Sequence, residues 1–296
     1  MANAYTGTTN AFSTPYLTVE EFKDAPTAID IDNLVFNSQD PDDQDAELAN
    51  TIARASSWID TFCNQVLAAT TESEQQRSRY STDGSIRFHP RYNPVIALTS
   101  LQYGYPPSLM ALPDCSVAWI EDQEVIVPNA TLGTWTSQGP LQFGALSSGA
   151  RNEVFLKYTY INGYANTTIV TAVAAASSLV VVDGTGITAG EMLKIYDGQY
   201  SENVTVASTY TFGSTTVPLT RPLVYGHNAG VSISALPPAV KQAAILVTTA
   251  FLKTRGDSSM TMAVTTSPGT ALPNADKVGE EIALAMQLLQ PYRRVR

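Results

Sequence analysis

Charged side chains are scarce in this sequence. Asp, Glu, Lys and Arg together make up 15% of its 296 residues, whereas about a quarter is usual for a soluble domain. There are only 2 cysteines and 2 histidines, and no apolar run approaches the roughly 18 residues of a membrane-spanning helix. We therefore expect no disulfide framework and no membrane span. Low charge beside many Ser, Thr, Ala and Tyr residues predicts a subunit that buries much of its surface against neighbours.

The few charges are also unbalanced, with a formal net charge of -10. This excess argues against general nucleic-acid binding through phosphate neutralisation. It is compatible with a surface that DNA passes without adhering, because like charges repel. No N-terminal stretch has the basic and then apolar pattern of a secretory signal, so we expect synthesis in the cytosol.

Motifs that carry chemistry are missing as well. The sequence has no phosphate-binding loop, no dinucleotide-binding glycine pattern, no H-E-x-x-H and no paired C-x-x-C. The acidic run 40–45 lacks the central glycine and closing glutamate of a calcium loop, which favours its interpretation as a helix start. Cys63 and Cys115 are expected to be small buried hydrophobes. We predict no catalytic residue, no metal site and no cofactor.

Helical periodicity marks four segments. Residues 236–257 begin with two prolines and then repeat apolar residues at spacings of three and four, as do residues 43–66. We expect these two helices to pack on each other. A shorter amphipathic helix spans 277–289, and a short one lies in 15–23, where Thr18 is the expected N-cap and Glu21 completes a capping box.

Residues 68–92 become basic and aromatic around the dipeptide Asp83-Gly84. This dipeptide predicts a tight hairpin turn flanked by 78–82 and 85–89. Three interpretations are open: a hairpin that grips an acidic or polar protein partner, a nucleic-acid contact, and a solvated hairpin without a special role. The first is our interface prediction, with Arg77, Arg79, Tyr80, Arg87 and Arg91 as its residues.

Strand signals fill the middle of the chain. Four strands are predicted before residue 164, at 98–103, 117–120, 124–127 and 153–161. Residues 165–235 form an island that is very poor in charge, with six short strands at 167–173, 178–182, 192–196, 202–209, 215–219 and 231–234. We predict an α+β protein whose residues 1–164 and 236–296 form a small helical bundle with β-hairpin and strand excursions, and whose residues 165–235 are an inserted small β-barrel or sandwich.

The order of these pieces resembles a known family. The segments are TPYLTVEEF, ASSWIDTFCNQ, RYSTDGSIRFHPRYNPVIALTSLQYG, the V-x-L-x-Y-x-Y-x-N-G-Y strand and LPPAVKQAAILVTTAFL. This series is similar to the head–tail connector, or adaptor, proteins of long-tailed bacteriophages. In that family the tyrosine-rich strand leads almost directly into the P-x-x-V-K-x-A helix, whereas here the charge-poor island intervenes.

The resemblance implies a non-enzymatic structural protein of the virion. Such adaptors form a dodecameric ring beneath the portal, line the DNA channel without sequence-specific binding, and present a surface to the tail or a stopper protein. Their C-terminal segment reaches the portal, which implies such an arm in 258–296 of this chain. Its predicted contact residues are Tyr292, Arg293, Arg294 and Arg296.

Two other function classes stay open. One is a tail or host-recognition protein whose 165–235 module binds carbohydrate, for which Trp119, Trp135 and tyrosines are candidate stacking residues. The other is a glycosidase or wall hydrolase, for which Glu121 and Asp122 are weak candidates, since carboxylate pairs abound in an acidic chain.

Overall fold

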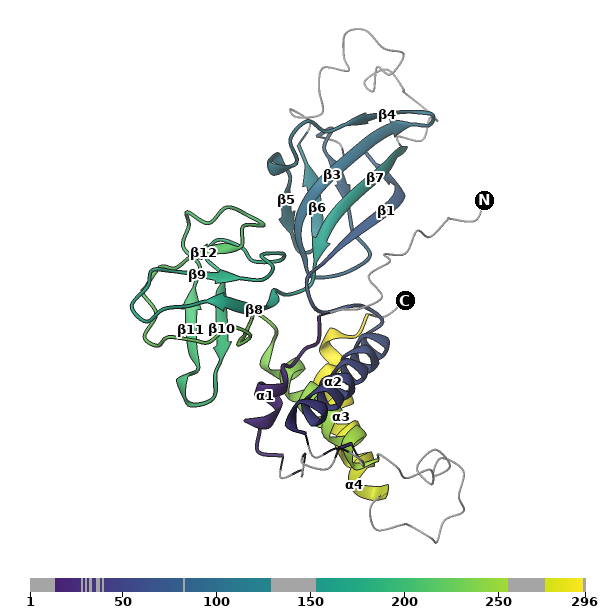
Figure 1. Ribbon diagram of the computed structural model, residues 1–296. Coiled ribbons are helices and arrows are strands. Elements are labelled where there is room, and N and C mark those ends of the chain that lie inside the picture. Colours follow the sequence, from purple (N-terminus) through teal and green to yellow (C-terminus); the bar gives the residue numbers. More distant parts are fainter. Residues whose placement is uncertain are drawn as a thin grey trace, which may run out of the picture. The chain divides into compact units, whose positions relative to one another are not determined.

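The computed structural model describes residues 14–27, 29, 31, 34–35, 38, 40–81, 83–128, 153–254 and 275–294. Within them the protein is α+β, with four α-helices and three antiparallel sheets (Figure 1). The chain divides into two compact units. The β unit contains Ala69–Gly163, and the helix–sheet unit contains Phe12–Ala68 and Tyr164–Arg296.

The β unit consists of two sheets around one core. The larger sheet has the strand order β1-β7-β3-β4, and the smaller has the order β2-β6-β5. Their bounds are β1 Thr70–Arg79, β2 Ile86–Phe88, β3 Val95–Tyr105, β4 Ser108–Ala111, β5 Trp119–Glu121, β6 Glu124–Val127 and β7 Glu153–Asn162. Apolar and tyrosine side chains of both sheets fill the core between them, including Leu101, Val125 and Tyr158.

The strands of this unit differ in part from the sequence-based expectation. Residues 70–77 are polar and were not expected to form a strand, yet β1 pairs with β7 over ten consecutive positions. Around the predicted turn, the antiparallel bridge between Tyr80 and Ile86 and the N–H of Ser81, which donates to the carbonyl of Ser85 (2.9 Å), join the two flanking segments, while β2 forms its ladder with β6. The turn itself is present, with the N–H of Gly84 donating to the carbonyl of Ser81 (2.9 Å). The predicted strand 117–120 is shifted, because a 3-10 turn at Cys115–Val117 precedes β5.

The third sheet belongs to the helix–sheet unit and is a curled six-stranded half-barrel. Its strand order is β11-β10-β13-β8-β9-β12. The bounds are β8 Asn166–Thr171, β9 Ser178–Val181, β10 Met192–Tyr196, β11 Glu202–Thr205, β12 Thr216–Pro218 and β13 Ser232–Ser234. All six predicted strands are therefore confirmed. Beyond the two edge strands, Val206 and Leu219 form a bridge, and an apolar core that includes Ile187 and Ile195 fills the interior.

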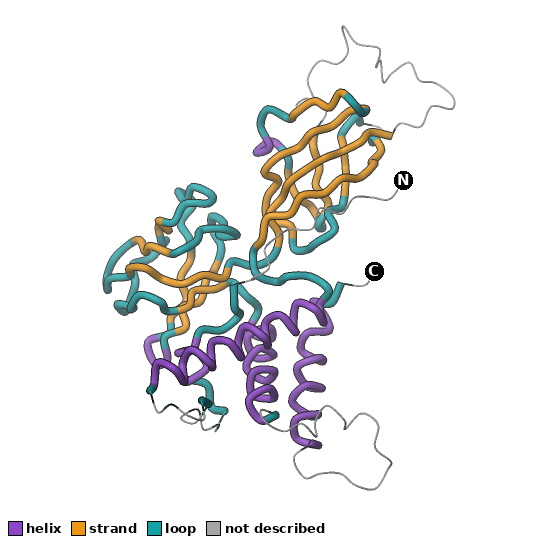
Figure 2. Tube along the Cα trace, turned by 45° about the vertical axis from the view of Figure 1, so that its right-hand side comes forward, coloured by secondary structure: helices purple, strands orange, loops and turns teal. Residues whose placement is uncertain are grey.

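The rest of this unit is built from four α-helices, drawn in purple in Figure 2. They are α1 Val19–Lys23, α2 Pro41–Cys63, α3 Pro238–Lys253 and α4 Ala275–Leu289. Asp40 caps α2 by accepting from the N–H of Asp42, and Asn64 ends it in the left-handed conformation (φ 55°). Ile52, Ile59 and Val247 lie in one core cluster that joins α2 and α3, so the expected packing of these helices is confirmed.

The described C-terminal residues lie on this same helical core. Ala285 and Leu289 of α4 are buried in the core cluster, and Lys253 of α3 forms an ion pair with Glu281 of α4. Of the arm expected in 258–296, residues 258–274 and 295–296 fall outside the described residues.

The chain enters and leaves the half-barrel at one place. The N–H of Ala235 donates to the carbonyl of Ala165 (2.8 Å), and Ser234 pairs with Asn166 between β13 and β8. Immediately before, the N–H of Tyr164 donates to the carbonyl of Leu67 (2.8 Å), just beyond α2. The two ends of 165–235 are thus neighbours at the edge of the helical core.

Candidate functional site

A buried lysine on α3 is the centre of a polar site in the helix–sheet unit. Lys241 stands in the first turn of α3 between Val240 and Ala243, both fully buried. Its side chain is 4% exposed, an unusual place for an ammonium group unless a partner compensates its charge.

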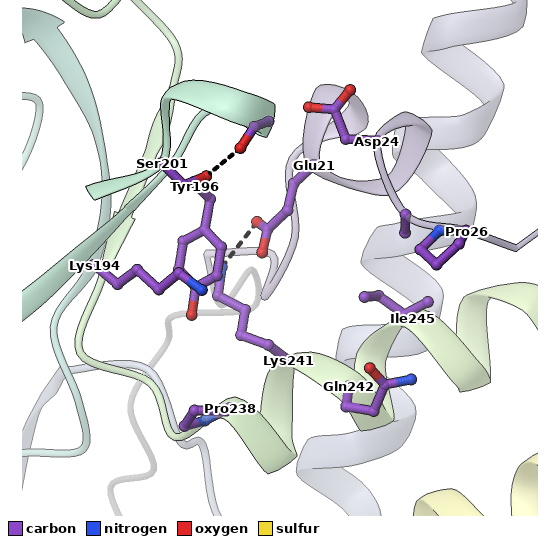
Figure 3. A pocket seen from close by; sticks show the side chains of 12 residues that line it. Glu21, Asp24, Pro26, Lys194, Tyr196, Ser201, Pro238, Lys241, Gln242 and Ile245 are labelled. Carbon is purple, nitrogen blue, oxygen red and sulfur yellow. Dashed lines mark hydrogen bonds and ion pairs between the residues drawn. The ribbon is translucent and has the colours of Figure 1, made fainter. Parts of the chain in front are cut away.

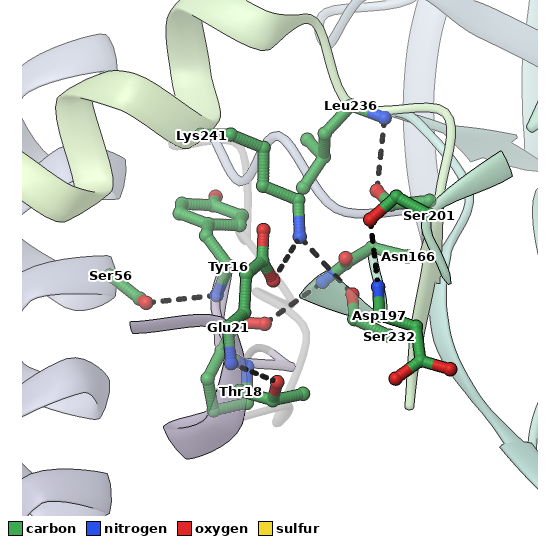
Figure 4. A network of polar contacts seen from close by, with 12 residues as sticks. Tyr16, Thr18, Glu21, Ser56, Asn166, Asp197, Ser201, Ser232, Leu236 and Lys241 are labelled. Carbon is green, nitrogen blue, oxygen red and sulfur yellow. Dashed lines mark hydrogen bonds and ion pairs between the residues drawn. The ribbon is translucent and has the colours of Figure 1, made fainter. Parts of the chain in front are cut away.

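That partner comes from α1, near the other end of the sequence. Lys241 Nζ donates to Glu21 Oε2 (2.9 Å), whose side chain is 7% exposed, and to Ser232 Oγ of β13 (3.2 Å). It also lies 4.4 Å from the ring centroid of Tyr196 on β10. Helix α3, helix α1 and two strands of the half-barrel therefore meet at one ammonium group. Figure 4 shows the contacts of Lys241 with Glu21 and Ser232, and Figure 3 shows Tyr196 beside Lys241. We call these four residues the lysine joint.

A pocket of about 330 Å³ opens beside the lysine joint (Figure 3). Lys194 of β10 lines it and brings a second ammonium group to 4.7 Å from the Tyr196 ring. Its other polar lining comes from Glu21, Asp24, Ser201 and Gln242. The lining holds two lysines and two carboxylates, so its chemistry does not select an anion or a cation.

The protonation behaviour of the lysine joint follows from burial. Burial lowers the pKa of Lys241, and the Glu21 carboxylate opposes that change. Burial likewise raises the pKa of Tyr196 to about 12, with Glu21 adding to the effect. An ammonium that is closed off from solvent and held by a carboxylate is poorly placed for attack on a substrate. The arrangement instead ties the half-barrel to the helices.

Further contacts reinforce this connection. Asn166 Nδ2 of β8 donates to the carbonyl of Pro15 (2.9 Å). A Cβ added at Gly198, after β10, would lie 2.9 Å from Asp24 Oδ2 behind α1, so only glycine leaves room there without displacing that carboxylate. The segment before α1 is itself anchored to the core, since Tyr16 OH contacts Asp60 and accepts from the N–H of Leu67 (2.9 Å).

A second polar cluster lies within the half-barrel. His227 has a fully buried side chain, with Nδ1 2.8 Å from Asp197 Oδ2 and Nε2 2.9 Å from Glu202 Oε1. Burial would raise the pKa of Glu202, but the N–H groups of Val224 and Tyr225 and the imidazole outweigh it and lower that pKa. Each ring nitrogen faces a different carboxylate. The cluster therefore connects the loop of His227 to Asp197, which follows β10, and to Glu202 of β11, and we do not interpret it as a metal site. More widely, no group of three or more His, Cys, Asp and Glu in the described residues could hold a metal ion.

The basic residues predicted as an interface lie in different settings of the β unit. Arg77 and Arg79 project from β1 with side chains 75% and 78% exposed, and each lies near Glu153 of β7 (3.8 and 3.9 Å). Arg87 on β2 forms an ion pair with Asp83 (3.4 Å). Tyr80 packs partly buried against the core of the unit.

The backbone of Arg91 is held by the inward-facing carboxylate of Glu74. Its N–H donates to both oxygens of Glu74 on β1 (3.2 and 3.1 Å), which also accept from Tyr158 OH (2.9 Å) and Tyr160 OH (2.5 Å) of β7. The tyrosine-rich strand is thereby explained: its tyrosines face inward and hold a carboxylate. Burial raises the pKa of both hydroxyls, and Glu74 raises it further.

The predicted C-terminal contact residues belong to the other unit. The carbonyl of Tyr292 accepts from Gln65 Nε2 (3.0 Å), and the N–H of Arg294 donates to the carbonyl of Cys63 (2.9 Å). The guanidinium of Arg293 lies 5.5 Å from the ring centroid of Phe62. These three residues therefore lie on their own helical core beside the end of α2, and Arg296 lies outside the described residues.

The cysteines and tryptophans can be placed in the same way. Cys63 and Cys115 are both free thiols, and Cys63 is buried as expected, with burial raising its pKa to about 12. Cys115 is only partly buried. Trp119 is 47% exposed on β5, whereas Trp135 lies outside the described residues.

Sequence patterns missed the lysine joint. The available signal was Lys241, a charged residue among the apolar residues of the P-x-x-V-K-x-A segment. Its partner Glu21 gave no signal, because the capping box already accounted for a glutamate at that position. Thr18 does cap α1 by accepting from the N–H of Glu21 (3.2 Å), but the Glu21 side chain goes to Lys241 instead of closing the capping box.

None of the helices that the structure describes is long and apolar enough to cross a membrane. No protein-family model matches this chain, and a comparison with curated proteins found no match.

Proposed function

We propose that this chain is a structural virion protein: a head-to-tail adaptor of a long-tailed bacteriophage. In this proposal it forms a dodecameric ring at the head–tail junction, between the portal and the tail or stopper protein. The ring lines the channel through which DNA passes, and the chain has no catalytic role. The resemblance in the order of its segments motivates the proposal, with 165–235 as an inserted passenger domain.

One observation carries it: the ends of 165–235 are paired. Because Ala235 donates to Ala165 at 2.8 Å, removing the half-barrel would leave the tyrosine-rich strand and α3 almost contiguous. That is the connection expected of an adaptor. An insertion at a single surface point disturbs the surrounding fold little. The shared core of α2, α3 and α4 supplies the helical bundle that an adaptor ring packs side by side.

The experiment is to express the chain with the portal protein of the same virus and image the product by electron microscopy. We expect a ring stacked on the portal, and a label placed in the loop at residues 208–213 should appear at the head–tail junction of complete particles. A chain that stays monomeric beside its portal and is missing from virions would refute the proposal.

A second function is favoured by one observation on the half-barrel. Tyr200 and Tyr225 have ring centroids 5.4 Å apart and are 48% and 40% exposed. Exposed aromatic rings of this kind suit a host-recognition protein whose half-barrel binds carbohydrate. Glycan-array binding that is lost on Tyr200→Ala would favour this function over the adaptor.

A further inference from the structure

The two faces of strand β1 carry opposite charges. Glu72 and Glu74 point inward, where Glu72 is 8% exposed, while Arg77 and Arg79 point outward. The register with β7 extends the outer row, because Gln75 pairs with Lys157 and Arg77 pairs with Phe155. Lys157 is exposed and stands diagonally next to Arg77. Three cations therefore share the outer face of the β1-β7-β3 sheet in a chain whose net charge is -10.

Much of the rest of this outer face is made of neutral polar groups. Ser73 on β1 and Thr159 on β7 are hydrogen-bonded through their hydroxyls (2.9 Å), and Thr99 on β3 donates to the Thr159 carbonyl (3.0 Å). Exposed Gln75 and Gln102 flank Lys157 in the same cross-strand row. Among the described residues of these three strands, Glu153 is the only carboxylate on the outer face, and its contacts with the arginines are long.

This composition is unlike that of a protein–protein interface. Such interfaces are anchored by buried aromatic and aliphatic side chains and are depleted in Lys and Ser. On β7 the large apolar side chains of this face are Phe155, partly buried, and Ile161, which is 7% exposed. Arg, Lys, Ser, Thr and Gln side chains are instead the groups that contact DNA phosphates.

We propose that the outer face of the β1-β7-β3 sheet contacts the phosphate backbone of duplex DNA through Arg77, Arg79 and Lys157. The contact is independent of base sequence, since we assign these hydroxyls, amides and cations to phosphates and not to base edges. It deepens the proposed function and rests on it for the source of the duplex, which is the DNA that passes through the ring.

The chain's negative charge makes this contact weak, and the small number of cations makes its salt dependence modest. Other acidic surfaces of the chain repel the duplex. Three cations release few counterions, because each phosphate neutralised contributes only about 0.9 to the slope of log K against log salt. A contact of this strength positions a passing duplex without arresting it.

The test is fluorescence-anisotropy titration of a labelled mixed-sequence duplex with the purified full chain at low ionic strength. We expect binding that falls as salt rises, with a slope of about -2 to -3. Arg77→Gln with Arg79→Gln should weaken binding at least about tenfold and reduce that slope by about 2. Glu153→Gln, which removes the carboxylate from the face, should strengthen binding and move the slope the other way.

The matched control is Arg54→Gln with Arg221→Gln, which gives the same net charge but removes exposed arginines of the other unit. An equal loss in both double variants would overturn the proposal, as would an absence of binding at low salt. Binding of labelled polyglutamate under conditions where the duplex does not bind would overturn it in favour of an acidic protein partner. Because the titration needs neither ring nor portal, failure here is distinguishable from failure of the proposed function.

Discussion

Lys241 and Glu21 form a buried ion pair with 2.9 Å between Nζ and Oε2, although 220 residues separate them in sequence. Lys241→Met should destabilise the helix–sheet unit by about 3–5 kcal/mol, because it leaves the Glu21 carboxylate buried without its cation. Urea unfolding measures the free energy, and amide hydrogen exchange should show faster opening of β13 next to Ser232.

The control for this prediction is twofold. Glu21→Leu combined with Lys241→Met removes both charges and should recover most of the lost stability, since well-packed apolar residues can replace a buried ion pair. Arg54→Met breaks the exposed pair with Glu47 and should cost less than about 1 kcal/mol. If Lys241→Met costs no more than Arg54→Met, the lysine joint does not stabilise the fold.

Glu74 should be a stability determinant of the β unit. Glu74→Gln keeps the size of the side chain but replaces one oxygen by an amide that cannot accept from a tyrosine hydroxyl. We expect a loss of about 1–3 kcal/mol, the range for a buried polar group left without its partner. Gln75→Glu, on the exposed side of the same strand, should change stability by less than about 0.5 kcal/mol. Equal effects of the two substitutions would contradict the inward position of Glu74.

The same cluster predicts how stability depends on alkaline pH. Burial first, and then Glu74, raises the pKa of Tyr158 and Tyr160 above the ordinary value of 10.0. The unfolded chain therefore loses these protons at lower pH than the folded chain, so their contribution is complete below pH 10 and falls as the pH rises further. Urea unfolding across this window should show a smaller decline in Tyr160→Phe than in the parent chain. If the free energy of unfolding declined equally in Tyr160→Phe and in the parent chain, ionisation of Tyr160 would not be the cause of the decline.

Local sequence patterns predicted the helices and strands of this fold better than they predicted which elements pair with each other. The amphipathic stripes of 43–66 and 236–257 contained enough information to place both helices and to pair them, because an apolar face must be buried somewhere. The polar strand β1 could not be predicted in this way. Its inward side carries Glu72, Glu74 and Gln76, and a carboxylate becomes a core group only through the hydroxyls that β7 brings to it.

The candidate sites could not be predicted from the sequence for a related reason. Lys241, Glu21 and Tyr196 are ordinary residues in their own segments, and only the fold brings them together. Arg77 and Arg79 were recognisable as basic, but the separation of charges between the two faces of β1 needed the strand assignment. Sequence-based reasoning therefore identified the charged residues without their geometry.

Gly184 tests the packing inside the half-barrel. A Cβ at this position would lie 2.2 Å from the carbonyl oxygen of Ser214 and 2.9 Å from the Tyr210 hydroxyl, which itself donates to Ser214 (2.7 Å). Gly184→Ala must displace backbone, so we expect a loss of about 1–3 kcal/mol, the usual cost of overpacking. Gly213→Ala is the control, because its Cβ meets open space and its cost of about 1–2 kcal/mol comes only from the positive φ of 79°. The two variants separate by hydrogen exchange: Gly184→Ala should speed exchange in β9, next to the displaced backbone, whereas Gly213→Ala should act only on its own turn. Unchanged protection of β9 in Gly184→Ala would show that the close approach of Gly184 to the Ser214 backbone does not stabilise the half-barrel.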